Sequence, residues 1–189
     1  EAYKDFEKSF SLLYDFVDMF VLNISCPNVK NLAKLQDTDT LKEIIEHLLS
    51  QRLFYDTHKP ILLKLSPDLD EAQVDEIVDL VLSCGLDGIV ACNTTNSRDK
   101  LTTNQSVIDA IGNGGLSGAP LFERTLERVK YIYEKTEGKL PIIASGGVMT
   151  PIQAQQLLEA GASLVEVYTG FIYNGPSFAK KIINHLKKC

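Results

Sequence analysis

Five short runs of aliphatic and β-branched residues recur along the chain, and segments with helical spacing separate them. Within a run the apolar residues are consecutive rather than alternating, which is typical of parallel strands buried on both faces. The intervening segments repeat apolar residues three and four positions apart, as crossover helices do. The runs cover residues 19–24, 60–65, 88–92, 141–144 and 163–168. This order predicts an α/β fold.

Two α/β architectures accommodate such a pattern, an open doubly wound sheet and a (β/α)8 barrel. Polar and glycine residues follow every run. A barrel would gather all of these strand ends into one ring of loops, whereas an open sheet gathers only those at a switch point. A whole barrel takes ~250 residues. The 189 residues are therefore expected to form one partial TIM-barrel domain over 1–189, with the last five βα units (strands 4 to 8) and without the opening strands.

Residue types that favour helix ends agree with this order. Asp39 or Thr40 is predicted to begin the first crossover helix, since both residue types favour helix N-caps. Asp70 and Pro151 are predicted to begin two later helices. Gly85 is predicted to end a helix, because glycine readily adopts the left-handed conformation found there.

The composition excludes several classes of protein. The 19 Lys and Arg against 25 Asp and Glu give a net charge of −6, which argues against nucleic-acid binding. The four cysteines and three histidines show no metal-ligand spacing, so reduced thiols and no metal site are predicted. No apolar run approaches the ~20 residues that cross a bilayer, and no signal-peptide pattern opens the chain. A soluble, cytoplasmic protein is predicted.

Glycines follow the fourth and fifth runs, as Gly146-Gly147 and Thr169-Gly170. Backbone amides without a Cβ beside them can approach an anion closely, and a helix that begins there adds its dipole. The loops after the last two strands of a barrel frequently form a phosphate site. These residues therefore predict a phosphate-bearing ligand, and the alternative is that the glycines only form tight turns.

Lys64 closes a run of aliphatic residues, which places an ammonium group at the rim of an apolar wall. There it would pair with an acid or face a group that becomes negative during turnover, unless it simply points into solvent. Asn23, Asn28 and Asn93 follow neighbouring runs, and their carboxamides suit an imide or pyrimidine edge. Each asparagine alone would more often be a turn residue.

Cys26 is the candidate acid or base, because it follows the first run in a loop with polar neighbours. A thiol has an ordinary pKa of about 8.5, so a nearby dipole or cation can ionise it near neutral pH. The alternative is a buried, inert cysteine. Cys84 and Cys92, which lie inside helix and strand patterns, are assigned to that inert class.

Five motifs, in order, resemble those of the dihydroorotate dehydrogenase family, the flavin enzymes of pyrimidine biosynthesis. They are Asn23-Ile-Ser-Cys26-Pro-Asn28, Lys64-Leu-Ser-Pro-Asp68, Asn93-Thr-Thr95, Gly114-Gly-Leu-Ser-Gly118-Ala-Pro-Leu121 and Tyr168-Thr-Gly-Phe-Ile-Tyr-Asn-Gly175-Pro. The likeness runs from about Phe20 to the C-terminus. Residues 31–36, the Asn-Thr-Thr signature and the Tyr-Thr-Gly-Phe signature are similar to the quinone-reducing class 2 rather than the soluble class.

The resemblance implies FMN as the cofactor, oxidation of dihydroorotate to orotate, and a quinone as the electron acceptor. It implies that Cys26 is the base, which removes the C5 proton while the C6 hydride passes to flavin N5. The implied orotate-binding residues are Asn23, Asn28, Asn93 and Thr94. The implied flavin-binding residues are Asn23, Lys64 beside the pyrimidine ring, Cys92, Gly118, Gly147, Tyr168 and Thr169, the last three at the phosphate end.

The chain departs from class 2 in two respects. Class 2 usually has a serine base, whereas Cys26 matches the soluble class. The family's opening strands and its N-terminal, membrane-facing helices have no counterpart among the 189 residues. A fragment that is inactive alone is therefore expected, or copies that cover each other's open sheet edges as a homo-oligomer. A full-length class 2 protein would be peripheral at the inner membrane.

Two other functions stay open on the sequence alone. Another phosphate-binding barrel, such as an isomerase of a sugar phosphate, would share the glycines but has no use for Cys26 or Lys64. A non-catalytic half barrel that serves only in assembly or folding is the third possibility.

Overall fold

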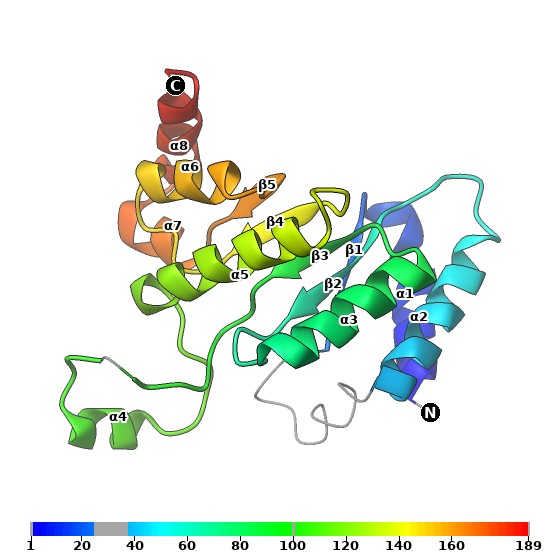
Figure 1. Ribbon diagram of the computed structural model, residues 1–189, viewed down its shortest axis with the longest axis horizontal. Coiled ribbons are helices and arrows are strands. Elements are labelled where there is room, and N and C mark those ends of the chain that lie inside the picture. Colours follow the sequence, from blue (N-terminus) through cyan, green and yellow to red (C-terminus); the bar gives the residue numbers. More distant parts are fainter. Residues whose placement is uncertain (1, 25–37, 100, 189) are drawn as a thin grey trace.

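The computed structural model describes residues 2–24, 38–99 and 101–188 of the protein. Its five strands form one parallel sheet in the order β1-β2-β3-β4-β5 (Figure 1). The strands are β1 (Phe20–Asn23), β2 (Ile61–Leu65), β3 (Gly88–Ala91), β4 (Ile142–Ser145) and β5 (Leu164–Glu166). Each strand coincides with a predicted run to within a few residues, so the α/β prediction is confirmed.

Helices connect the strands and cover one face of the sheet. The crossover helices are α2 (Thr38–Arg52), α3 (Glu71–Cys84), α5 (Phe122–Lys135) and α6 (Pro151–Glu159). Helix α1 (Ala2–Leu13) packs on α2, and α8 (Phe178–Leu186) packs on α6. The described residues also form four short helical segments, namely η1 (Tyr14–Phe16), α4 (Gln105–Ile111), η3 (Ala119–Leu121) and α7 (Thr169–Asn174). In Figure 1, α3 and α5 run across the front of the sheet.

The sheet is apolar on both faces, because successive strand residues point to opposite sides. On the helix side, residues such as Leu63 and Leu65 belong to the main hydrophobic core. On the other side, Leu62, Val90 and Ile143 form a separate small cluster of buried residues. This double burial explains why the runs in the sequence are consecutive rather than alternating.

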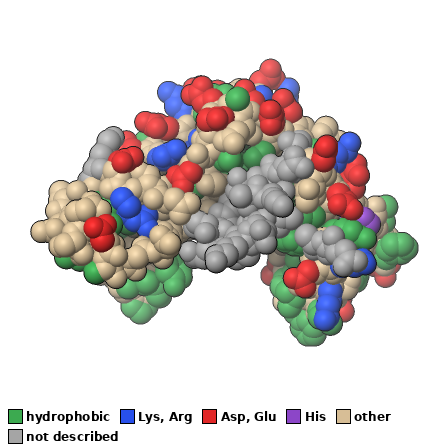
Figure 2. All heavy atoms as spheres, turned by 90° about the horizontal axis from the view of Figure 1, so that it is seen from below, with side chains coloured by type: hydrophobic (Ala, Val, Ile, Leu, Met, Phe, Trp, Pro, Cys, Tyr) green, Lys and Arg blue, Asp and Glu red, His purple; other side chains and the backbone are tan. Residues whose placement is uncertain are grey.

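The sheet curves as the wall of a barrel does. Strands β3 and β4 separate β2 from β5, which in a flat sheet would hold β2 and β5 roughly 14 Å apart. The side chains of Lys64 on β2 and Glu166 on β5 nevertheless come within 3.5 Å of each other. Seen from below, the molecule is an arch with a hollow between two ends where hydrophobic side chains gather (Figure 2). These features belong to a partial (β/α)8 barrel and not to an open doubly wound sheet.

Most helix boundaries follow the predicted residues. Asp70 caps α3 by accepting a hydrogen bond of 2.8 Å from a backbone amide, and Gly85 ends that helix with a left-handed φ of 75°. Helix α6 begins at Pro151. The prediction for α2 is wrong, because the helix begins at Thr38 and Asp39 lies in its first turn. An acidic residue is favourable there too, since it faces the positive end of the helix dipole.

The connection between β3 and α5 carries α4 away from the barrel wall (Figure 1). No residue of α4 is buried. The two ends of the connection pair in an antiparallel bridge between Thr95 and Leu116, with backbone hydrogen bonds of 3.1 and 2.7 Å. Thr94 and Ser117, which flank this bridge, are thereby brought to the same place at the carboxyl end of β3.

Candidate active site

A cavity of about 430 Å³ opens at the carboxyl ends of strands β2 to β5. Its volume lies within the range of ~300–1,000 Å³ that is usual for small-molecule sites. The predicted site residues that line it are Lys64, Cys92, Asn93, Thr94, Gly118, Gly147, Tyr168 and Thr169. Residues predicted from separate strand ends therefore surround one cavity. Cys26 and Asn28, the predicted base and a predicted substrate ligand, lie outside the described residues.

Lys64 faces the inner side of the sheet, above the apolar cluster that Leu62 and Val90 help to form. Its side chain is 22% exposed, and its Nζ donates a hydrogen bond of 3.5 Å to Oε2 of Glu166. The lysine thus stands at the rim of an apolar wall beside an acid, with its ammonium group on the lining of the cavity. A cation so placed can stabilise negative charge that develops on a ligand.

Two of the predicted carboxamides meet across the sheet. Nδ2 of Asn93 donates a hydrogen bond of 3.0 Å to Oδ1 of Asn23, although the two residues are 70 positions apart. Oδ1 of Asn93 accepts a hydrogen bond of 2.9 Å from the amide of Thr94. Asn23 is itself in register with Lys64, because β1 pairs with β2 in parallel. Asn23, Asn93 and Lys64 therefore lie at the ends of three neighbouring strands.

Two glycines of the cavity wall are positions where a side chain cannot fit. Gly147 has a φ of 76°, and a Cβ there would lie 2.3 Å from the backbone nitrogen of Phe122. Gly118 has a φ of 88°, and a Cβ there would lie 2.9 Å from Cγ2 of Thr169. The Thr169 hydroxyl lies 3.0 Å from that of Ser117, which joins the two loops. Glycine is therefore required at both positions for close packing of the loops, and both glycines line the cavity beside Thr169.

The two helices near these glycines differ at their amino ends. Helix α7 begins at Thr169, on the cavity wall, and no side chain caps it. Helix α6 does not begin at Gly146-Gly147, because Val148 and two further residues intervene and Thr150 caps the helix through a capping box. The expectation that the helices after both glycine pairs begin with free amides is therefore wrong for the first pair, because the Thr150 side chain accepts from an amide of α6.

The predicted cavity residues Cys92 and Tyr168 have opposite environments. Cys92 is 2% exposed, and burial raises the pKa of its thiol to about 12. It stays protonated at neutral pH and forms an inert part of the wall, as predicted. Tyr168 is 80% exposed and lies at the edge of the cavity.

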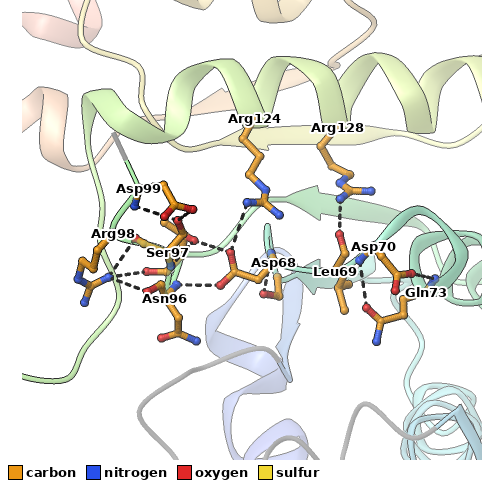
Figure 3. A network of polar contacts seen from close by, with 12 residues as sticks. Asp68, Leu69, Asp70, Gln73, Asn96, Ser97, Arg98, Asp99, Arg124 and Arg128 are labelled. Atoms are coloured by element: carbon orange, nitrogen blue, oxygen red, sulfur yellow. Dashed lines mark hydrogen bonds and ion pairs between the residues drawn. The ribbon is translucent and has the colours of Figure 1, made fainter. Parts of the chain in front are cut away.

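Asp68, which does not line the cavity, contacts the start of the β3–α5 connection (Figure 3). The carboxylate of Asp68 accepts hydrogen bonds from the hydroxyl of Thr95 and, at 2.8 Å, from the amide of Asn96. Arg124 on α5 lies 3.8 Å from the same carboxylate. Because Thr95 directly follows Thr94, this network positions the start of the β3–α5 connection.

Arg98 links the two ends of the β3–α5 connection through hydrogen bonds to backbone carbonyls. One guanidinium nitrogen donates to the carbonyls of Thr95, Asn96 and Ser97 at 3.2, 3.3 and 3.3 Å. The other donates to the carbonyl of Gly114, at the far end of the connection. A planar guanidinium can satisfy several carbonyls at once in this way, which an ammonium group cannot do with the same geometry.

Sequence reasoning assigned no role to several residues that the structure places at the site. Glu166 and Ser145 line the cavity from β5 and β4, and Ser117 lines it from the loop. Asp68 and Arg98 support that loop. The signal for Glu166 is a carboxylate inside an otherwise apolar run, and the signal for Asp68 is its place in the second motif.

The curved parallel sheet and its cavity define a (β/α)8-barrel protein with a small-molecule site at the carboxyl ends of its strands. The profile of the family "Dihydroorotate dehydrogenase" matches residues 1–189. The chain belongs to this family.

Curated relatives of the chain carry the name dihydroorotate dehydrogenase (quinone). The protein of Trichodesmium erythraeum is 42% identical over 193 residues, which cover 99% of this chain and 50% of the relative. That of Nostoc punctiforme is 43% identical over 98% of this chain and 50% of the relative. That of Christiangramia forsetii is 43% identical over 96% of this chain and 52% of the relative. The chain spans about half the length of the curated relatives it matches.

Solved structures agree with the family assignment. The chain is similar to ligand-free DHODH from Eimeria tenella, with a TM-score of 0.91 and 34% identity over 98% of this chain and 55% of the other. It is similar to the same organism's DHODH in complex with ferulenol, with a TM-score of 0.89 and 34% identity over 97% of this chain and 53% of the other.

Over 2–24, 38–99 and 101–188, no helix combines the length and the hydrophobicity that spanning a bilayer demands. Within the same part of the chain, no three His, Cys, Asp or Glu side chains are grouped so that they could hold a metal ion.

Proposed function

We propose that this protein oxidises dihydroorotate to orotate in pyrimidine biosynthesis, with FMN bound in the 430 Å³ cavity. The observation that carries the proposal is that one cavity combines Lys64, the carboxamide of Asn93 and the bare backbone of Gly147, in a chain of this family. A sugar-phosphate isomerase would use the glycine but not the lysine or the carboxamide.

The residues of the cavity fit FMN at both of its ends. FMN, when bound, supplies the acceptor for a hydride at N5, and its pyrimidine ring gains negative charge on reduction. The part of the cavity lined by Gly118, Gly147 and Thr169 would hold the phosphate, since glycine backbone can approach an anion closely and no side chain caps the start of α7 at Thr169. Lys64 would lie at the pyrimidine ring, where its ammonium group stabilises the added charge. Tyr168 and the buried Cys92 would contact the flavin as parts of the wall.

The carboxamides would hold the substrate. Asn23, Asn28, Asn93 and Thr94 are the proposed ligands of the dihydroorotate and orotate rings. A carboxamide can donate to a ring carbonyl and accept from a ring N–H in one plane, which matches an imide edge. The hydrogen bond between Asn93 and Asn23 supports this assignment, because it orients two of the four groups before any ligand binds.

Cys26 would be the base. Its thiolate takes the proton from C5 of dihydroorotate, and the electrons of that C–H bond form the C5–C6 double bond. The hydrogen on C6 would leave with both electrons of its own bond as a hydride, for which FMN would supply the acceptor. Substrate oxidation is thereby balanced by transfer of one proton to the chain and one hydride to the cofactor. Cys92 cannot take this role, because burial raises the pKa of its thiol to about 12.

A quinone would reoxidise the cofactor, as the names of the curated relatives suggest. We further propose that residues 1–189 form a single domain equivalent to strands 4 to 8 of the family barrel. Turnover would require the barrel's remaining strands, since half of each relative's length has no counterpart here. In the full-length protein those other parts would provide contact with the inner membrane, from the cytoplasmic side. A measurement of the protein's molecular mass in solution tests whether copies of this chain form a homo-oligomer.

The experiment that tests this function is anaerobic absorbance spectroscopy of the full-length protein, with all strands of the barrel, supplied with FMN. We expect the protein to retain FMN through gel filtration, dihydroorotate to bleach its visible absorbance, and a quinone to restore it. Lactate, an unrelated reductant, is the control and should leave the colour unchanged. A protein that stays colourless with excess FMN, or whose bound FMN ignores dihydroorotate, would contradict the proposal.

A further inference from the structure

A carboxylate stands beside Lys64 on the wall of the candidate flavin cavity. Glu166 is the last residue of β5 and lines the cavity. Its Oε2 lies 3.5 Å from Nζ of Lys64, and the side chains of the glutamate and the lysine are 39% and 22% exposed. Glu166 is in register with Ser145, whereas Lys64 is in register with Val90, so the pair spans the inner face of the sheet. Barrel curvature brings the two together.

This pair is not needed to hold the strands together. Strand β5 already pairs with β4 over three register positions, and β2 pairs with both β1 and β3. Placing a lysine and a glutamate in partial burial also carries a desolvation cost that a neutral pair would avoid. Strand pairing therefore does not depend on the glutamate, whose carboxylate lies where it can act on the field that Lys64 exerts in the cavity.

Opposite charges at this separation largely cancel each other at longer range. An isolated ammonium group would attract a group that gains negative charge in the cavity with its full field. With Glu166 beside it, a ligand a few ångströms away meets a dipole rather than a cation. A flavin ring next to such a pair gains less stabilisation on reduction than it would next to lysine alone.

We propose that Glu166 compensates the charge of Lys64 and thereby lowers the reduction potential of the bound flavin. The inference rests on the proposed function, since it concerns FMN in this cavity. Glu166 acts through Lys64 and is a positioning residue rather than a catalytic one. With this lower potential the flavin would still accept a hydride from dihydroorotate, and the reduced flavin would transfer its electrons more readily to the acceptor.

The experiment is a measurement of the midpoint potential in the FMN-loaded full chain and its Glu166→Gln variant. We expect the variant to favour the reduced flavin by at least tenfold, which for a two-electron couple is a rise of about 30 mV. Glu166→Asp retains a carboxylate in the cavity, and we expect its equilibrium to move by less than threefold. Glu159→Gln removes the same charge from an exposed position on α6 and should leave the potential unchanged.

Unchanged potential in Glu166→Gln, or equal shifts in the Gln and Asp variants, would overturn the inference. If Glu166→Gln does not fold, Lys64→Met provides the second measurement. We expect its equilibrium to move at least tenfold toward the oxidised flavin, and an unchanged midpoint potential in this variant would overturn the inference. Failure of the wild-type protein to retain FMN would instead overturn the proposed function and this inference with it. FMN that is bound and reduced by dihydroorotate, with a potential insensitive to Glu166, overturns only the inference.

Discussion

The two ends of the sheet each carry a pair of opposite charges, and the pairs differ in their surroundings. At the amino end, Asp87 precedes β3 and accepts hydrogen bonds from Arg52 at 2.5 Å and from the amide of Ile61 at 2.9 Å. At the carboxyl end, Lys64 and Glu166 are 3.5 Å apart on the wall of a cavity. The first carboxylate is surrounded by donors of the protein, whereas the second leaves room for a ligand.

This difference indicates that the pair of Asp87 and Arg52 stabilises the fold, whereas the pair of Lys64 and Glu166 belongs to the candidate active site. Burial alone would raise the pKa of Asp87, but the Ile61 amide, Arg52 and His58 together hold it below its ordinary value of 3.8. The charged form is thus the one that the folded state favours. In barrels the amino end of the strands generally serves stability and the carboxyl end serves chemistry. Substitutions at the two ends should therefore affect different measurements.

The largest effect is expected at the carboxyl end. Lys64→Met should slow flavin reduction by dihydroorotate about 100-fold, because it removes a charge that stabilises the reduced ring. The melting temperature should change little. Stopped-flow absorbance measures the rate. Lys130→Met is the matched control, since Lys130 is 67% exposed on α5 and is not among the residues that line the cavity. Equal losses in both variants would contradict a local role for Lys64.

At the amino end, Asp87→Asn should lower the free energy of unfolding by ~2–3 kcal/mol at neutral pH, because Arg52 loses its charge partner in a partly buried site. Urea unfolding measures this loss, and flavin reduction per folded molecule should stay at the wild-type rate. An Asp87→Asn variant with wild-type stability but slow flavin reduction would contradict the assignment of stability to the amino end and chemistry to the carboxyl end.

The same pair makes stability depend on pH in a defined direction. The pKa of Asp87 is lower in the folded state than its ordinary value of 3.8. Its contribution to the free energy of unfolding is therefore fully present above the pKa of the unfolded state and is lost as the pH falls through the pKa of the folded state. The gap in stability between the wild type and Asp87→Asn should therefore narrow on acidification below about pH 4. A gap that widened there would show that Asp87 is not the group responsible.

Cys26→Ser tests the proposed base. A hydroxyl loses its proton far less readily than a thiol, whose ordinary pKa is about 8.5. We expect the pH optimum of flavin reduction to move upward, with FMN affinity unchanged. Rate profiles across pH, with Cys84→Ser as the matched control, measure the shift. An identical profile in Cys26→Ser and the wild type would show that another group takes the C5 proton.

The smallest effect is expected in the loop that supports the cavity. Arg98→Lys keeps the charge but cannot reach three neighbouring carbonyls and Gly114 together. We expect KM for dihydroorotate to rise about fivefold, equivalent to ~1 kcal/mol of lost positioning, with kcat nearly constant. Lys130→Met again provides the control. A fall in kcat with unchanged KM would place Arg98 in the chemical step instead.

Local sequence signals predicted the strands and several helix ends. The runs were identifiable because both faces of the sheet are apolar, as Leu63 on one face and Leu62 on the other illustrate. Asp70 and Gly85 carry their signals in their own residue types. Helix α6 shows the limit of this reasoning, because its start at Pro151 was predicted but the amides expected to be free there are capped by Thr150.

The contacts that define the site could not be read from the sequence. Glu166 lies inside an apolar run, and its proximity to Lys64, 102 positions away, depends on how strongly the sheet curves. The hydrogen bond between Asn93 and Asn23 likewise joins residues that only the sheet brings together. The residue types at the strand ends predicted a site, but its internal geometry depends on the closure of the barrel.

A crystal structure of the protein with FMN tests the central claim most directly. The account predicts the phosphate against the backbone at Gly147 and Thr169, with the pyrimidine ring of the flavin within hydrogen-bonding distance of the Lys64 ammonium group. Electron density for FMN elsewhere, for example in the outer groove of about 560 Å³ that Arg124 and Arg128 line, would contradict it.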